Sequence, residues 1–408
     1  MGHRNSRVAS AVRRRHRLPS RLQPTVPSMV PPVPLRMTGG TGKGGRRMVT
    51  HMSDTDDPGA SRITEQSASA PPAGVRRGLV LGGGGMLGAA WTVGALCAVA
   101  EATGWDPGRA DVILGTSAGS ILGTLLASGV GPYELRDHQR GRPIAAGPLL
   151  GVEFDYDTAV GGPVPLRPRP GIGSPGLLRR TFRHPRDYPF LTMVSAFVPP
   201  GRGSVAPIGE LVRLLAPAGG WLDHAGLRLV AVDYGTGSRV VFGDQDAPPA
   251  GLADAVMASC AIPGWFAPVA VDGHRYIDGG AWSATNADLL LGRGLDEVYV
   301  LAPMAVRIRP VGGTGPRPVG PTSVVERRGQ PRGVLAHLVS HYRRTVTRQM
   351  LREAGMLRVG GTRVHLLAPT VDDLAAMGPN VMDPARRSEV LETALRTCAA
   401  ALAEIRPV

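Results

Sequence analysis

The chain has 408 residues, 43% of them hydrophobic, which is enough to bury the core of one large domain or two ordinary domains. The formal net charge is +14, but residues 1–75 hold twelve Lys or Arg against four Asp or Glu and so carry +8 of it. Outside this leader no basic stretch is interleaved with aromatic residues, which argues against nucleic-acid binding.

The leader, residues 1–75, is basic and rich in proline and arginine. It lacks the continuous apolar stretch of a signal peptide, because the arginine cluster at 13–17 is followed by proline-rich sequence. We expect it to be disordered. An alternative is that it is not part of the native protein, since translation could start at Met48 or Met52, ahead of the first recognisable strand.

From residue 76 the pattern alternates between short β-rich runs and apolar helices. It predicts an α/β domain over residues 76–408 with a mainly parallel sheet covered on both faces. The first expected elements are a strand at 79–81, a helix at 87–102, a strand at 112–114 and a helix at 118–128. Two uncharged runs, 78–100 and 112–133, are long enough to span a membrane. Each has a glycine cluster near its start, so we interpret both as a strand followed by a core helix.

Residues 141–205 are rich in proline, glycine and arginine, and we expect an irregular, lid-like insertion there. Regular structure returns after this insertion. The expected elements are a helix at 208–215, strands at 227–233 and 239–242 joined by a hairpin-like turn, and a strand at 298–302. Residues 307–332 form a second irregular insertion of similar composition.

A helix is expected at 335–356, because apolar residues recur there at helical spacing. Its arginines fall largely on another face: Arg343, Arg344, Arg348 and Arg352. Two interpretations of that face stay open, a solvated arginine face, which we favour, and peripheral contact with anionic membrane lipid. A strand at 364–367 precedes a last helix that starts at Asp383-Pro384.

The three cysteines, Cys97, Cys260 and Cys398, lie far apart in apolar surroundings. We expect reduced core thiols and a cytoplasmic protein. No two cysteines have the spacing of a zinc pair and the ten histidines are scattered, so we expect no metal site.

Ser117 lies in the sequence Gly115-Thr116-Ser117-Ala118-Gly119, between an apolar strand and an apolar helix. Strand, tight turn and helix are the setting of a nucleophile elbow, which presents a serine hydroxyl at the carboxyl edge of a sheet. Gly115 and Gly119 allow the tight turn to approach its neighbours. We predict that Ser117 is a nucleophile; the alternative is a serine that only caps the helix.

The glycine run Gly83, Gly84 and Gly85 follows a strand and precedes a helix, so its N–H groups can converge as an oxyanion hole. With Gly88, the same run also matches the dinucleotide fingerprint GxGxxG. A dinucleotide site requires an acidic residue near the end of the next strand, but Asp111 precedes that strand. We expect an oxyanion hole, and dinucleotide binding is the weaker alternative.

Together with Asp278-Gly279-Gly280, these motifs resemble those of the patatin-like phospholipases, namely a GGGxRG-like loop, a GTSAG-like elbow and a DGG or DGA motif. All three occur here in that order, and further similarity runs through residues 258–263. The resemblance implies a three-layer α/β/α fold and a Ser/Asp dyad without histidine. Ser117 would attack an ester carbonyl with Asp278 as its base, and Gly279 and Gly280 would leave room for the approach.

The resemblance also implies hydrolysis of acyl esters in phospholipids, lysophospholipids or neutral lipids, with no cofactor. An aspartate is a poor base in water, so we expect Asp278 to lie in a partly dehydrated site. His274, four residues before Asp278, is expected to be structural.

The chain departs from the family at Leu87, where arginine or lysine is common. We expect reduced rather than abolished activity, which the substitution Leu87→Arg would raise. A catalytically silent lipid-binding or scaffold protein with the same fold is the alternative to an enzyme.

Overall fold

The structure is a computed structural model that describes residues 74–144, 147–150, 152, 167–168, 170–216, 220–308 and 334–405. The leader expected over residues 1–75 lies outside the described residues except for its last two positions. The insertion expected at 307–332 lies outside them except for its first two.

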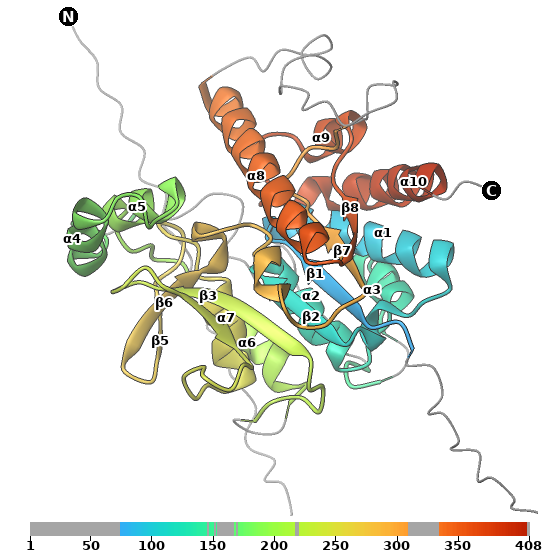
Figure 1. Ribbon diagram of the computed structural model, residues 1–408, viewed down its shortest axis with the longest axis horizontal. Coiled ribbons are helices and arrows are strands. Elements are labelled where there is room, and N and C mark those ends of the chain that lie inside the picture. Colours follow the sequence, from blue (N-terminus) through green and yellow to red (C-terminus); the bar gives the residue numbers. More distant parts are fainter. Residues whose placement is uncertain are drawn as a thin grey trace, which may run out of the picture. The chain divides into compact units, whose positions relative to one another are not determined.

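A mixed sheet of eight strands, counted over the described residues, lies at the centre of the fold (Figure 1). Its order is β5-β6-β3-β2-β1-β7-β8, and β4 pairs with β3 off this path. The strands are β1 Arg77–Leu81, β2 Val112–Thr116, β3 Leu227–Asp233, β4 Arg239–Phe242, β5 Val269–Val271, β6 His274–Asp278, β7 Glu297–Leu301 and β8 Arg363–Leu367. Neighbours from β3 to β8 run parallel, whereas β4, β5 and β6 pair antiparallel.

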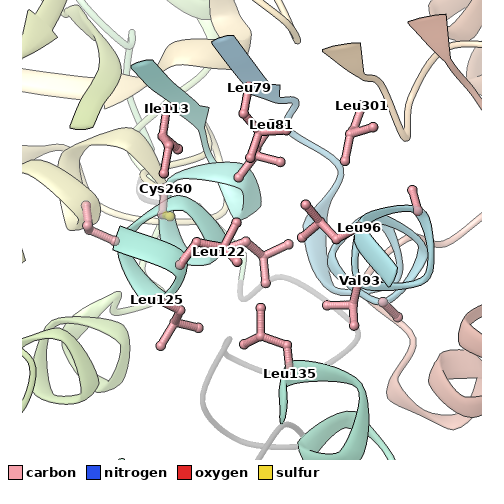
Figure 2. Close-up of a cluster of buried hydrophobic side chains, with 14 of the residues drawn as sticks. Leu79, Leu81, Val93, Leu96, Ile113, Leu122, Leu125, Leu135, Cys260 and Leu301 are labelled. Atoms are coloured by element: carbon pink, nitrogen blue, oxygen red, sulfur yellow. The ribbon is translucent and has the colours of Figure 1, made fainter. Parts of the chain in front are cut away.

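Helices cover both faces of this sheet. They are α1 Gly85–Thr103, α2 Ala118–Ala127, α3 Pro132–Gln139, α4 Pro175–Arg183, α5 Phe190–Phe197, α6 Ala206–Arg213, α7 Leu252–Ser259, α8 Val334–Val359, α9 Val371–Met377 and α10 Arg387–Ile405. Because successive strand residues point to opposite faces, each face has its own core. Leu79 and Leu81 pack against α1 and α2, as Figure 2 shows, whereas Val80 packs in the other cluster with α8. The predicted three-layer α/β/α fold is confirmed.

Among the described residues, α1 is the one helix that is long and apolar enough to span a membrane by length and composition alone. Its most apolar window is 72% buried inside the fold. The helix approaches α10 so closely that a Cβ at Gly94 would lie 2.7 Å from the Cβ of Ala394. A helix packed on all sides needs apolar residues all round, so the central position of α1 accounts for its composition.

Most of the predicted elements that the structure describes are found within a few residues of their expected bounds. Asp383 caps a short 3₁₀ turn, Pro384–Arg386, that leads directly into α10 at Arg387. The antiparallel hairpin of β5 and β6 and the short helices α3, α7 and α9 were not predicted. Each of these is too short to show a clear period in the sequence.

The prediction of an irregular insertion over 141–205 is wrong for its later part, which contains α4 and α5. The Ser174 hydroxyl caps α4 by accepting the N–H of Leu177, and Pro175 occupies the first turn. α5 begins directly after Pro189. Because proline fits the start of a helix, these prolines mark helix starts rather than irregular structure.

Arg343 differs from the expectation of a solvated arginine face on α8. Its side chain is buried, and its Nη1 donates to the carbonyl of Pro303 at 3.0 Å. Burial lowers the pKa of this guanidinium to about 10. Arg344, Arg348 and Arg352 of the same helix are exposed.

Cys97, Cys260 and Cys398 are free and buried, as the sequence predicts. Burial raises the pKa of each thiol, that of Cys97 to about 11. These thiols therefore stay protonated at neutral pH and are poor nucleophiles.

Candidate active site

Ser117 lies at the sharp turn between β2 and α2. Its φ of 54° and ψ of −125° fall in a backbone region that residues other than glycine rarely adopt. The flanking glycines make the turn possible. A Cβ at Gly119 would lie 2.0 Å from the carbonyl oxygen of Leu81, and a Cβ at Gly115 would lie 2.6 Å from the Cα of Ser120. The turn therefore has the geometry of a nucleophile elbow.

Three hydrogen bonds hold this strained turn. The N–H of Ser117 donates to the Ser259 hydroxyl at 3.0 Å, and that hydroxyl donates to the Val230 carbonyl at 2.7 Å. The Ser120 hydroxyl donates to the Ser117 carbonyl at 2.6 Å. Ser259 was not identified from the sequence, where its only signal is the family similarity through residues 258–263.

The order of the strands brings Asp278 to Ser117. β3 pairs with both β2 and β6, so that Val230 lies opposite Thr116 and Ala231 lies opposite Asp278. Asp278 at the end of β6 therefore lies next to the residue that follows Thr116, which is Ser117. The Ser117 side chain is close enough to the Asp278 carboxyl group to lower its pKa.

The carboxyl group of Asp278 is buried, with the residue only 5% exposed. Burial raises its pKa to about 6, because the charged form loses hydration. The Ser117 side chain and the N–H of Gly280, which donates to the carboxylate at 2.7 Å, lower the pKa but do not cancel this effect. At neutral pH the group is still mostly deprotonated, and it is a stronger base than an exposed aspartate.

Gly279 and Gly280 follow Asp278 in a tight 3₁₀ turn. A Cβ at Gly279 would lie 2.4 Å from the carbonyl oxygen of Val230, so no side chain fits there. Gly280 supplies the N–H that the Asp278 carboxylate accepts. The two glycines therefore fix the position of the carboxylate relative to β3.

The glycine loop, Gly83–Gly85, lies directly against the elbow, since a Cβ at Gly83 would lie 3.2 Å from the Cβ of Ser117. Gly83 itself donates its N–H to the Ala284 carbonyl at 2.8 Å. The expectation that Gly83 is an oxyanion donor is therefore wrong for this conformation. The N–H groups of Gly84 and Gly85 have no acceptor among the described residues and lie at the start of α1, where the helix dipole favours negative charge.

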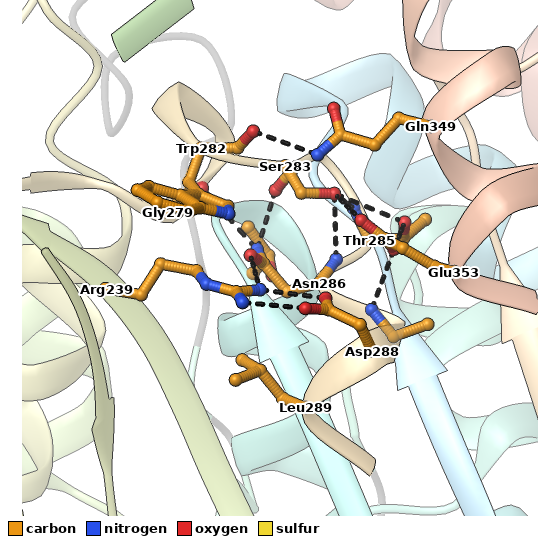
Figure 3. Close-up of polar contacts among 12 residues, drawn as sticks. Arg239, Gly279, Trp282, Ser283, Thr285, Asn286, Asp288, Leu289, Gln349 and Glu353 are labelled. Carbon is orange, nitrogen blue, oxygen red and sulfur yellow. Dashed lines mark hydrogen bonds and ion pairs between the residues drawn. The ribbon is translucent and has the colours of Figure 1, made fainter. Parts of the chain in front are cut away.

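The segment Ser283–Ala287 links the glycine loop, the elbow and the Asp278 turn. Figure 3 shows Ser283, Thr285 and Asn286 of this segment between Gly279 and Glu353. Ala284 accepts from Gly83, and the Asn286 amide donates to the Thr116 hydroxyl at 3.1 Å and to the Ser283 carbonyl at 2.6 Å. This segment was not identified from the sequence. Its bonds to Gly83 and Thr116 join positions far apart in the chain, which no local pattern reveals.

Glu353 of α8 holds the segment Ser283–Ala287 through three hydrogen bonds. Its carboxylate accepts from the Ser283 hydroxyl at 2.6 Å, from the Thr285 hydroxyl at 2.5 Å and from the N–H of Ala287 at 2.9 Å. The group is buried, and burial raises its pKa although these donors oppose the shift. On the other side Arg239 makes a bidentate ion pair with Asp288, at 2.6 and 2.8 Å.

Leu87 is fully buried in α1 and belongs to the core cluster on the α1 side of the sheet. Its N–H donates to the Val381 carbonyl at 2.9 Å. A guanidinium at this position would lie in the apolar core. The expectation that Leu87→Arg would raise activity is therefore not supported by the surroundings of the side chain.

His274 is held by Asp233, with Nδ1 and Oδ2 2.8 Å apart. The other oxygen of Asp233 accepts the N–H groups of Gly235 and Thr236 and so shapes the turn between β3 and β4. This arrangement agrees with a structural role for His274. Among the residues that the structure describes, no group of three or more His, Cys, Asp or Glu is placed to hold a metal ion.

The geometry does not favour a dinucleotide site. Gly88 is a glycine because of packing, since a Cβ there would lie 3.2 Å from the Cβ of Pro303. Asp111 lies at the start of β2 and accepts the N–H of Arg77 at 2.7 Å, at the edge of the sheet away from the glycine loop. The acidic residue is thus not available to a ribose bound at Gly83–Gly88.

A cavity of about 380 Å³ lies at the start of β3, away from Ser117. Two of its charged residues pair with each other, since Asp244 accepts from Arg228 at 2.5 Å, and Asp244 also accepts from Arg293, outside the lining, at 2.6 Å. This cavity belongs to the opposite edge of the sheet and plays no part in the geometry around Ser117.

Of three comparisons with known proteins, the one with family models gives the family of the chain. A family model described as patatin-like phospholipase matches residues 79–291, which is more than half of the chain. No curated protein sequence matches the chain significantly. Among solved structures the chain is similar to the crystal structure of VipD from Legionella pneumophila, with 16% identity and a TM-score of 0.37 over 82% of this chain and 69% of that one.

Proposed function

Because the chain belongs to the patatin-like phospholipase family, we propose that it is a serine hydrolase that cleaves carboxylic esters of phospholipids, lysophospholipids or related lipids. Membership of the family supports lipid acyl hydrolase activity in general. The observation that carries the proposal to particular residues is that the strand register brings Ser117, on its strained elbow, beside the buried carboxyl group of Asp278.

In the first half of the proposed reaction, the Asp278 carboxylate takes the hydroxyl proton as the Ser117 oxygen attacks the ester carbonyl. The N–H groups of Gly84 and Gly85 donate to the oxyanion of the tetrahedral intermediate. When the intermediate collapses, Asp278 gives the proton to the oxygen of the departing alcohol. The product at this stage is an acyl-enzyme on Ser117.

In the second half, a water molecule attacks the acyl-enzyme and gives a proton to Asp278. The fatty acid leaves, and Asp278 returns the proton to the Ser117 oxygen. A carboxyl group whose pKa is about 6 can both accept and release this proton near neutral pH, which suits a dyad without histidine. The reaction needs no cofactor.

Labelling with a fluorophosphonate probe tests the proposal. We expect one labelled serine, Ser117, and we expect Ser117→Ala to abolish both labelling and hydrolysis of a short p-nitrophenyl ester. Asp278→Asn should abolish hydrolysis while the circular dichroism spectrum stays unchanged. Ser128→Ala, at the other end of α2, is the matched control and should keep full activity.

A folded wild-type chain that neither labels nor hydrolyses any ester would contradict the proposal and favour a silent lipid-binding protein. Normal turnover in the Asp278→Asn variant would show that Asp278 is not the base, although Ser117 could still be the nucleophile. We also propose that the protein is cytoplasmic, with the three free, buried cysteines as support.

A further inference from the structure

An exposed aromatic surface lies on α4 and α5. The chain has only six phenylalanines, and three of them are exposed on this pair of helices. Phe182 is 71% exposed, Phe190 67% and Phe197 53%. Phe182 and Phe197 pack edge to face, with ring centroids 6.0 Å apart, so the rings form one surface rather than isolated residues. Val194, also exposed, lies on the same face of α5 as Phe190 and Phe197.

The same helices carry unpaired positive charge. Four exposed arginines lie on or just after α4: Arg179, Arg180, Arg183 and Arg186. None of them makes an ion pair or a side-chain hydrogen bond within the described part of the chain. Asp187 is the one acidic residue between positions 172 and 198, so this stretch has a net charge of +3 (four minus one).

The opposite side of α4 and α5 packs onto the turn that follows Asp278. The Thr192 hydroxyl of α5 donates to the Ala281 carbonyl at 2.7 Å. Leu177 and Ala196 form a buried cluster with residues of β3 and β6 and with Ala281. Figure 1 shows helices α4 and α5 beside β3 and β6, on the side of the sheet away from α10. The aromatic surface is thus held firmly next to the candidate active site.

We propose that the exposed face of α4 and α5 binds the surface of an anionic lipid bilayer and so brings the Ser117 site to its substrate. Phenylalanines that enter the acyl boundary, together with arginines that meet lipid phosphates, are the combination that holds proteins at membrane surfaces. A contiguous exposed apolar patch is otherwise uncommon on a soluble chain. The choice of lipid as the occupant rests on the proposed function, whereas binding itself needs no catalysis.

Vesicle binding of the full chain tests this proposal. The Ser117→Ala background keeps the lipid intact, and sedimentation with vesicles of pure phosphatidylcholine or of an equimolar mixture with phosphatidylglycerol gives the partition coefficient. We expect binding to the anionic vesicles. Substituting Phe182, Phe190 and Phe197 by serine should lower the partition coefficient by up to roughly tenfold for each ring.

The arginines are tested separately. Arg179→Gln with Arg183→Gln should weaken binding to the anionic vesicles by about fivefold for each charge and leave binding to phosphatidylcholine unchanged. The matched controls lie on α8: Arg348→Gln with Arg352→Gln removes two exposed arginines, and Val359→Ser removes a side chain on a residue that is 91% exposed. Neither control should change binding, because α8 does not carry the aromatic surface.

In the active chain, the phenylalanine variants should keep hydrolysis of a monomeric short ester and lose hydrolysis of vesicle lipid. Anionic vesicle binding that survives the three serine substitutions would overturn the proposal. So would loss of binding in the α8 controls, which would place the membrane surface there. A dimer in sedimentation velocity that the serine substitutions dissociate, with no change in vesicle binding, would make this face a contact between two copies and would also overturn it.

Discussion

The N–H of Gly83 donates to the carbonyl of Ala284 at 2.8 Å, which joins the glycine loop before α1 to the segment that follows Asp278. This bond occupies the N–H of Gly83, so the oxyanion donors that we propose are Gly84 and Gly85. It also makes the position of the loop depend on Ser283–Ala287, which Glu353 of α8 holds through three hydrogen bonds. A helix more than two hundred residues from the elbow in sequence thus supports the loop that we propose to bind the oxyanion.

Glu353→Gln should lower both stability and activity. The Ser283 hydroxyl accepts the N–H groups of Thr285 and Asn286, so it has no lone pair left for an amide donor, whereas it can donate to a carboxylate. A glutamine therefore leaves a buried polar group unsatisfied, which costs about 1–3 kcal/mol. Urea unfolding should show this loss, and the turnover of a short ester should fall because the Ala284 carbonyl shifts. Arg352→Gln, exposed on the same helix, is the control and should change neither quantity.

Asp278→Asn should stabilise the fold at neutral pH while it removes activity. The pKa of Asp278 is about 6 in the folded chain and about 3.9 in an unfolded one, so the folded state holds this proton more tightly. The protonated Asp278 carboxyl group therefore contributes to the stability of the folded state. This contribution is fully present below about pH 3.9 and is lost as the pH rises through about 6. The asparagine of the Asp278→Asn variant does not titrate. The free energy of unfolding of the variant should therefore rise relative to that of wild type between about pH 3.9 and about pH 6, and exceed it by about 1–3 kcal/mol at neutral pH.

Urea unfolding of both proteins at several pH values measures this difference. Asp244→Asn is the matched control with the opposite sign. Burial raises the pKa of Asp244, but hydrogen bonds from Arg293 and Arg228 lower it more, so the net pKa lies below its usual range. This control should therefore be less stable than wild type at neutral pH, and its deficit should shrink in acid. A destabilised Asp278→Asn variant at neutral pH would contradict the buried-base interpretation.

The pH dependence of ester hydrolysis should follow the same carboxyl group. Only the carboxylate can take the proton from Ser117, so kcat/KM should rise with pH, with a midpoint near the pKa of about 6, and level off above it. A histidine could give a similar curve, since a free imidazole titrates near about 6.5. His274→Asn separates the two cases, because its profile should keep the wild-type midpoint. Loss of this midpoint in His274→Asn would show that His274, and not Asp278, is the group that controls the pH dependence.

The sequence was sufficient to predict the parts of the site that depend on local order. Three apolar residues, a glycine turn and an apolar helix predict the elbow at Ser117, and the structure forms it at that position. The alternation of strands and helices likewise predicts the parallel sheet. Such features are encoded within about fifteen consecutive residues, where the period of the apolar side chains and the glycines that permit tight turns are both visible.

Features that depend on distant partners could not be predicted in the same way. Nothing near Gly83 indicates that Ala284 accepts its N–H, and nothing near Arg343 indicates that the guanidinium is buried against Pro303. The helices α4 and α5 were missed because their prolines were interpreted as breaks rather than starts. In each case the tertiary environment decides between two local alternatives that the sequence allows equally.

Leu87→Arg shows the consequence for engineering. The family pattern suggests that a positive charge here would assist the oxyanion loop, but Leu87 is fully buried in the core. An unpaired guanidinium in such surroundings should lower the free energy of unfolding by about 3 kcal/mol or more. Leu87→Met, which conserves volume, should cost less than about 1.5 kcal/mol and is the control. Urea unfolding and short-ester turnover, measured together, decide the matter: an arginine variant as stable as wild type with faster turnover would show that the side chain reaches the loop rather than the core.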